Sequence, residues 1–315
     1  MASPLTCSPE VDSGATAIKR YEIDDRFSVE LGPAERGIVD IWCPLIPENP
    51  YQRVLKIAID APEPWAVSYD QEHGNRVLHS QHSRPLAAIL TFRVVYAVER
   101  RSVVHMLDPA CAGPLETPAL FLRFLCPEQF VDVNDRTREL GMKVIGRETN
   151  VLGQARRIYE HVAGTMTYDA AQQSWKGSTE HALVCSVGNC NDIHALFISL
   201  CRSVGIPTRL VLGQALEPPP PGQEACELCG YHCWAEFFAS GLGWVPVDAS
   251  CACKYGKGHL FGDLEMNHIA WSVGRDILLA PPQRGGRVLF FAGPYVEVDG
   301  QPYRAVQRRV LFSEV

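Results

Sequence analysis

Hydrophobic and polar residues alternate along short runs in the first third of the chain, which is the period-two pattern of half-buried β-strands. The clearest runs are Arg53–Asp60, Arg76–His79 and Ala88–Val98, and turn-forming residues at 73–75 separate two of them. Successive runs of this kind are typical of an antiparallel sandwich. The pattern therefore predicts an N-terminal β-sandwich, and no cluster of titratable residues in it indicates a chemistry of its own.

Prolines interrupt this pattern between residues 109 and 136, at Pro109, Pro114, Pro118 and Pro127. Proline-rich turns fit an interdomain crossing better than a regular element, so this stretch predicts a boundary near residue 130. We therefore expect two domains, residues 1–130 and residues 131–315.

Apolar residues take up helical spacing after this boundary. Val151–Ala163 is expected to form one amphipathic helix, and Cys190–Val204 a second helix with an apolar face wide enough to be central. Strands are expected again afterwards, at Thr208–Gly213, Tyr231–Phe238, Gly243–Ala249, Ala270–Ile277, Val288–Val298 and Arg309–Phe312. Helices followed by an antiparallel sheet predict an α+β second domain.

Composition and charge narrow the function classes. The 315 residues include 29 Lys+Arg and 36 Asp+Glu, a formal net charge of −7, so we expect no broad cationic surface for nucleic acid or an anionic membrane. The first residues lack the basic and apolar regions of a secretory signal, and no apolar window approaches the roughly 20 residues of a spanning helix. We expect a soluble, cytoplasmic protein with no nucleic-acid or membrane partner; the oligomeric state stays open.

Cys190 lies where a nucleophile is expected. Gly188 and Asn189 form a turn that brings Cys190 to the first turn of the apolar helix. Backbone N–H groups and the helix dipole at that end favour a thiolate. A buried structural cysteine at a helix start is nevertheless common, so the signal requires partner residues elsewhere in the chain.

A thiolate nucleophile needs an imidazole and a group that orients it, and the segment 231–250 contains both. The run Ser240–Gly243 joins two strand-like stretches, so we expect a hairpin centred near Gly241 in which Trp234 faces Asp248. His232 lies two residues from Trp234 and therefore points to the same face. His232 and Asp248 are then diagonal neighbours within side-chain reach.

These residues resemble the transglutaminase-like (transglutaminase core) superfamily. The resemblance rests on Gly188–Phe197 with Gly205–Pro207, then His232–Glu236, then Gly243–Asp248, and it continues at Phe261–Leu264, Gly274–Asp276 and Pro294–Gly300. It is strongest to bacterial members of the cysteine-protease type with an N-terminal β-rich domain, and so covers most of the chain. The resemblance implies a papain-like core and a Cys-His-Asp triad of Cys190, His232 and Asp248. His268 departs from it, since relatives often have arginine there.

The expected reaction is acyl transfer from an amide of a protein or peptide, without a cofactor. Cys190 attacks the carbonyl, His232 protonates the leaving amine, and Asp248 fixes the imidazole tautomer. The oxyanion is expected to accept hydrogen bonds from the Cys190 backbone and from Trp175 or Asn189. Hydrolysis is the first expectation. Transfer to an amine, as in a transglutaminase, and a catalytically silent peptide-binding module are the alternatives, and calcium dependence stays open.

Three neighbouring residues are not expected to be catalytic. His194 shares the helix face of Cys190, but an i+4 neighbour points along the helix and away from a substrate. Asp192 is expected to support the helix start by its charge. Glu236 is expected to pair with a cation such as Arg209.

Four further cysteines flank the predicted hairpin. Cys226 and Cys229 precede the first strand, Cys251 and Cys253 follow the second, and continuing the hairpin register places Cys229 opposite Cys253. Zinc, a disulfide and free thiols all stay open for these four residues. No residue of the chain is assigned as a metal ligand.

Overall fold

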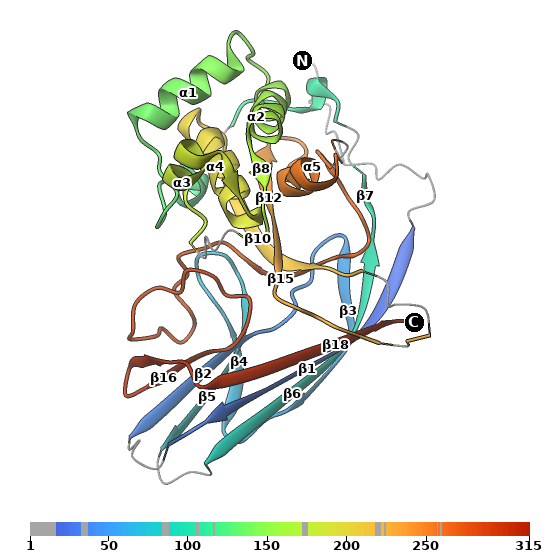
Figure 1. The fold of residues 1–315 in the computed structure, drawn as a ribbon, viewed down its shortest axis with the longest axis vertical. Helices are drawn as coiled ribbons and strands as arrows, with labels where there is room; N and C mark the ends of the chain where they lie inside the picture. The colour runs from blue at the N-terminus through green and yellow to red at the C-terminus, as the bar shows by residue number, and fades with distance from the viewer. Residues whose placement is uncertain are drawn as a thin grey trace, which may run out of the picture. The chain divides into compact units, whose positions relative to one another are not determined.

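The computed structural model describes residues 17–32, 37–83, 88–104, 107–115, 117–171, 176–217, 222–223, 225–256, 258 and 260–315. The chain divides into two compact units (Figure 1). The β unit comprises Ala17–Ser102, Leu212–His232 and Glu265–Val315, and the described part of the core unit comprises Val103–Val211 and Cys233–Leu264. The chain passes from one unit to the other within strands β10 (Thr208–Ala215) and β12 (His232–Ala239).

The β unit contains two five-stranded sheets. One has the strand order β11-β18-β1-β6-β3 and the other β17-β16-β2-β5-β4. The bounds are β1 Ile18–Glu30, β2 Ile38–Pro44, β3 Gln52–Asp60, β4 Trp65–Tyr69, β5 Arg76–Ser83, β6 Ile89–Arg101, β11 Cys226–Glu227, β16 Tyr295–Val298, β17 Gln301–Tyr303 and β18 Val306–Glu314, and β15 (His268–Val273) also belongs to this unit. The three runs predicted as strands before residue 100 lie in β3, β5 and β6.

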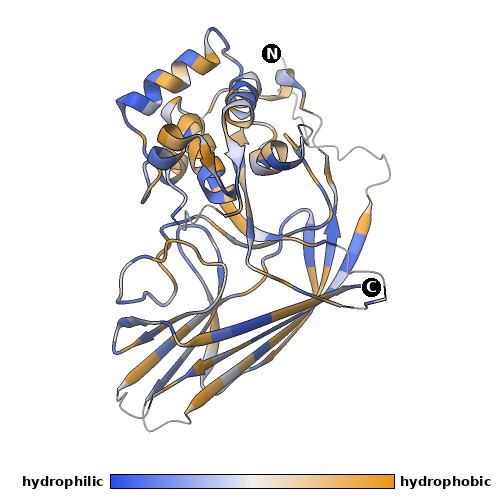
Figure 2. Cartoon of the chain, in the orientation of Figure 1, coloured by the Kyte–Doolittle hydropathy of each residue, from blue (hydrophilic) through white to orange (hydrophobic). Residues whose placement is uncertain are grey.

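The two sheets enclose one hydrophobic core. Alternate residues of β1, among them Ile23, Phe27 and Val29, are buried with inward residues of β2, β6, β16 and β18. Figure 2 shows the resulting alternation of hydrophobic and hydrophilic residues along these strands. Phe27 and Phe92, on neighbouring strands, stack with ring centroids 4.5 Å apart. This arrangement is the predicted β-sandwich.

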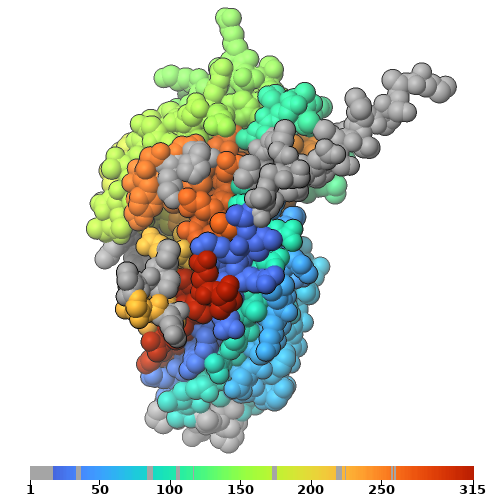
Figure 3. All heavy atoms as spheres, turned by 90° about the vertical axis from the view of Figure 1, so that its right-hand side faces the viewer, coloured from blue at the N-terminus to red at the C-terminus, as the bar shows by residue number. Residues whose placement is uncertain are grey.

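The sandwich is completed by the end of the chain. Strand β18 pairs antiparallel with β1, from Tyr21 opposite Glu314 to Val29 opposite Val306. In Figure 3 the C-terminal residues, in red, therefore lie against the first strand, in dark blue. The two units are thus not the two consecutive segments expected from the sequence. Strand β18 can pair with β1 because the unpaired N–H and C=O groups at the edge of a sheet can bond to any strand that reaches them, however distant it is in sequence.

The core unit places four helices before a β-hairpin, in the predicted order, and a fifth, unpredicted helix directly after it. The helices are α1 Asp135–Ile145, α2 Val151–Thr165, α3 Thr179–Cys185, α4 Cys190–Ser203 and α5 Ala249–Tyr255, with short 3₁₀ turns at Pro109–Cys111 and Pro118–Phe124. The short strands of the unit are β7 Val103–Val104, β8 Thr167–Tyr168, β9 Val187–Gly188, β13 Gly243–Val247 and β14 Asp263–Leu264. Helix α4 contacts α1, α2, α3 and α5, and all 14 of its residues are buried (Figure 1). The prediction of a central helix is confirmed.

Candidate active site

Cys190 is the first residue of α4 and is 7% exposed. The helix begins there because Asn189 and Asp192 form a capping box. The Asn189 side chain accepts a hydrogen bond from the Asp192 backbone N–H, and the Asp192 side chain accepts one from the Asn189 backbone N–H. Asp192 is fully buried. Its Oδ2 accepts from the backbone N–H of Asn189 at 3.2 Å, and its Oδ1 from that of Ser178 at 3.1 Å. The expectation that Asp192 supports the helix start is confirmed.

Gly188 makes the tight approach to this helix possible. Its backbone pairs with Tyr168 in the parallel ladder of β8 and β9. A Cβ atom at this position would lie 2.7 Å from the Cβ of Asp192 and 2.8 Å from its Oδ2. Any residue with a Cβ atom at position 188 would clash with the capping carboxylate of Asp192. Glycine is therefore needed for strand β9 to lie this close to the start of α4.

The hairpin of β12 and β13 has the predicted register. Ala235 pairs with Val247 and Ala239 with Gly243, as expected for a turn centred on Gly241. One face of the two strands is buried, and on it Phe237 and Val245 are both fully buried.

Asp248 ends the second strand of this hairpin and begins helix α5. The sequence predicted a strand through Ala249, but the Asp248 side chain caps a helix there instead. Its Oδ1 accepts from the Cys251 backbone N–H and from the Ser250 hydroxyl, both at 2.8 Å. The carboxyl group is fully buried, and these two bonds hold one of its oxygen atoms against the start of α5.

His194 lies one turn after Cys190 and is also fully buried. Its Nδ1 is 2.8 Å from the Cys190 carbonyl oxygen, and its Nε2 accepts the Ala249 backbone N–H at 3.1 Å. The same Nε2 is 3.6 Å from Asp248 Oδ1. The sequence correctly placed His194 on the face of Cys190, but it gave no signal for the link to α5, because the chain after Asp248 was expected to be extended.

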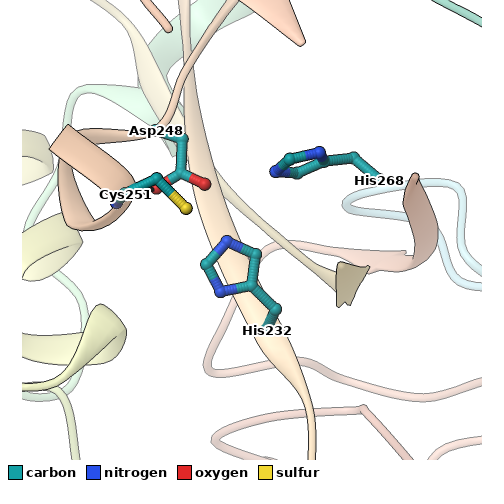
Figure 4. A group of neighbouring side chains, drawn as sticks. All are labelled: His232, Asp248, Cys251 and His268. Carbon is teal, nitrogen blue, oxygen red and sulfur yellow. Dashed lines mark hydrogen bonds between the residues drawn. The ribbon is translucent and has the colours of Figure 1, made fainter. Parts of the chain in front are cut away.

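His232 is the first residue of β12 and belongs to the β unit, where it is half-buried. Its ring lies edge-on to that of His268, with centroids 5.6 Å apart (Figure 4). His268 is buried, and its Nδ1 is 2.8 Å from the Asn267 side-chain oxygen. The sequence singled out His268 only as a departure from the family pattern, whereas the structure makes it a neighbour of the predicted base.

The predicted triad is thus divided between the two units. Cys190 and Asp248 belong to the core unit, and His232 to the β unit. Of the two expected oxyanion donors, Trp175 lies outside the described residues. The side-chain oxygen of Asn189 accepts the Asn191 backbone N–H at 2.9 Å, so this residue has a capping role. The catalytic roles of the three triad residues stay a prediction.

The four flanking cysteines do not continue the hairpin register. Cys251 and Cys253 lie on helix α5, and Cys226 lies on β11, where it pairs with Phe312 of β18. The geometric argument that brought the four thiols together was therefore wrong, because a helix replaces the assumed strand. None of the eleven described cysteines is in a disulfide. Burial raises the pKa of the Cys253 thiol to about 11, with a further contribution from the nearby Asp248 carboxylate.

Other side chains have the chemistry of metal ligands. They are Asp248 and Cys251, at the start of α5, and His232 and His268 in the β unit, all drawn in Figure 4. Imidazole, carboxylate and thiolate groups are the usual ligands of zinc. Of the four cysteines considered for zinc from the sequence, this group includes only Cys251.

Glu236 makes the predicted ion pair. The Arg209 guanidinium donates to the Glu236 carboxylate at 2.8 Å and lies over the Trp244 ring, 4.0 Å from its centroid. Both charged side chains are about 20% exposed. The pair joins β10 to the β12–β13 hairpin.

None of the helices in the described residues is both long enough and apolar enough to span a bilayer. The cytoplasmic location stays a prediction.

Several known proteins resemble this chain in sequence or in fold. An uncharacterized protein from Haemophilus influenzae is 25% identical over 90% of this chain and 86% of its own length. The crystal structure of a protein from Cytophaga hutchinsonii, named a putative cysteine protease, superposes with a TM-score of 0.63 over 94% of this chain and 91% of that one. The identity to that protein is 16%, so the likeness concerns the fold. Residues 138–249 match the family model of the transglutaminase-like superfamily, and this segment contains Cys190, His232 and Asp248. The chain therefore carries a transglutaminase-like core preceded by a β-rich region.

Proposed function

We propose that the protein is a thiol enzyme that transfers the acyl group of a protein or peptide amide, with Cys190 as nucleophile, His232 as acid and base, and Asp248 as the group that orients His232. The observation that carries this proposal is the placement of Cys190 at the capped start of the buried helix α4. Backbone N–H groups at that position stabilise negative charge on the sulfur atom and on an adjacent oxyanion.

The reaction proceeds in two steps. His232 takes the proton of the Cys190 thiol, and the sulfur bonds to the amide carbonyl carbon. The C–N bond breaks and His232 gives that proton to the departing amine, which leaves a thioester. Water then attacks the thioester carbonyl, His232 accepts a proton from the water, and the C–S bond breaks to release the acid and restore the thiol. The buried Asp248 carboxylate stabilises the imidazolium that forms on His232 within each of the two steps.

Hydrolysis is the proposed outcome, and transfer to an amine differs only in the second nucleophile. Two probes separate these activities. Fluorescein-labelled casein reports peptide-bond hydrolysis, and incorporation of dansylcadaverine into dimethylcasein reports transfer to an amine.

The proposal predicts that Cys190→Ala abolishes turnover of whichever probe the wild type consumes while the folded protein is retained. Cys185→Ser is a matched control, because Cys185 is exposed at the end of α3. Turnover by Cys190→Ala at the wild-type rate contradicts the assignment. A wild type that binds casein but turns over neither probe favours the peptide-binding module.

A further inference from the structure

The buried His194 ring joins the two elements of the core unit that carry predicted catalytic residues. The Cys190 carbonyl oxygen can only accept a hydrogen bond, so the His194 Nδ1, 2.8 Å from it, carries a proton. The His194 Nε2 accepts the Ala249 N–H at 3.1 Å and therefore carries none. The ring is thus neutral, in the Nδ1–H tautomer, with both nitrogen atoms in hydrogen bonds.

This tautomer suits the surroundings of the ring. The nearest carboxylate oxygen, Asp248 Oδ1, lies 3.6 Å from Nε2 and already accepts from Ser250 and Cys251. On the other side, the Cys233 sulfur lies 3.7 Å from Nδ1 and 3.3 Å from the Asn191 side-chain oxygen. If the His194 ring is neutral, the negative charge of Asp248 can pair with a different group. A protonated His194 ring at this position would itself neutralise that charge.

The two hydrogen bonds of His194 end on residues at or beside the proposed catalytic groups. One ends on the backbone of Cys190 itself, and the other on the residue directly after Asp248. Ala249 is also the first residue of α5. Its backbone N–H has no acceptor within the helix, because the first N–H groups of a helix precede any carbonyl that could accept from them. One side chain therefore fixes the start of α4 against the start of α5.

We propose that His194 is a positioning residue for acyl transfer, which holds Cys190 and Asp248 at a fixed separation through its neutral ring. This inference rests on the proposed function. It assigns no contact with substrate to His194, and it excludes His194 as the base, because its only proton-accepting nitrogen is engaged by Ala249.

Three substitutions separate the two hydrogen bonds. The His194→Gln amide reaches the position of Nε2 and can accept from Ala249, while His194→Asn places a donor near the position of Nδ1. His194→Leu has a similar volume and neither group. His161→Leu is the matched control, since His161 lies half-buried on α2, where its charged neighbour is Lys143 of α1.

The first readout is the rate at which iodoacetamide alkylates Cys190 at pH 6, measured by peptide mass spectrometry on the full-length protein. We expect His194→Leu to slow alkylation at least tenfold, His194→Gln to restore most of the rate, and His161→Leu to leave it within twofold. A merely structural role would lower the unfolding midpoint of His194→Leu without changing the alkylation rate of the folded protein, and that result overturns the inference.

The second readout needs no variant. In protein labelled with ¹⁵N-histidine, His194 is expected to show a protonated Nδ1 and an unprotonated Nε2 at neutral pH. A protonated Nε2 overturns the inference, and this measurement decides the question if His194→Leu fails to fold. Alkylation of wild-type Cys190 no faster than that of Cys185 refutes the proposed function instead. Fast wild-type alkylation with an unaffected His194→Leu refutes only the role of His194.

Discussion

Replacing Asp192 should destabilise the core unit strongly, because one buried carboxylate satisfies the starts of two helices. Its two oxygen atoms accept the backbone N–H groups of Ser178, the cap of α3, and Asn189, the cap of α4. Asp192→Ala leaves these two partly buried N–H groups without this acceptor, at about 1–3 kcal/mol each. We therefore expect a loss of about 2–6 kcal/mol in the free energy of unfolding, a large part of the roughly 5–15 kcal/mol of a typical domain.

Asp192→Asn should recover only part of this loss. An amide offers one oxygen atom, and its NH₂ group would face the second backbone N–H, so one of the two bonds is lost and a donor meets a donor. Asp135→Ala is the control, since Asp135 also lies in the first turn of a helix, α1, but is exposed. It should cost no more than about 1 kcal/mol.

The assay is urea unfolding followed by circular dichroism at 222 nm, with the free energy obtained by linear extrapolation. The reasoning predicts the order of stability wild type, then Asp135→Ala, then Asp192→Asn, then Asp192→Ala. A loss below about 1 kcal/mol for Asp192→Ala, or equal losses for the buried and the exposed aspartate, would refute it.

Three further predictions concern packing, pH and surface charge. Gly188→Ala should cost about 1–3 kcal/mol and slow Cys190 alkylation, because its methyl group meets Asp192 at 2.7 Å. Burial lowers the pKa values of His79 and His82 from 6.5, so below about pH 6.5 the unfolded chain binds more protons than the folded protein, and the free energy of unfolding should fall as pH falls. Glu236→Gln should cost at most about 1 kcal/mol and leave alkylation unchanged, since its ion pair is partly exposed.

Each of these has a direct check in the same unfolding and alkylation assays. Gly164→Ala, where an added Cβ meets nothing within 4 Å, should be neutral or stabilising, and an equal loss at Gly164 and Gly188 would contradict the packing argument. Glutamine at both 79 and 82 should flatten the pH dependence between pH 7 and 5.5, and an unchanged slope would contradict the assignment to these histidines. A tenfold slower alkylation in Glu236→Gln would contradict a purely local role for its ion pair with Arg209.

The sequence predicted those features that depend on local spacing. The apolar periodicity of residues 190–204 corresponds to α4, which ends at Ser203, and the glycines around 241 gave the register of the β12–β13 hairpin. The role of Asp192 and the pair of Arg209 with Glu236 also follow from near neighbours in the sequence or across two strands.

Features that depend on distant segments were not predictable. The pairing of Tyr21 with Glu314 joins residues at opposite ends of the chain, and no pattern within either strand specifies its partner. The helix after Asp248 was missed because Cys251 and Cys253 alternate with other residues as in a strand, whereas an aspartate cap decides the local structure. His194 could not be connected to Ala249 for the same reason, since the contact exists only if α5 is a helix.

The central claim is that Cys190 is a nucleophile activated by His232, and a brief iodoacetamide pulse at pH 6 tests it most directly. Ordinary thiols, with a pKa near about 8.5, react slowly at this pH. The account predicts that Cys190 is alkylated much faster than Cys185 and Cys126, which are exposed, and that His232→Gln removes this advantage. Alkylation of Cys190 at the rate of the exposed cysteines, or a fast rate that His232→Gln leaves unchanged, would contradict the claim.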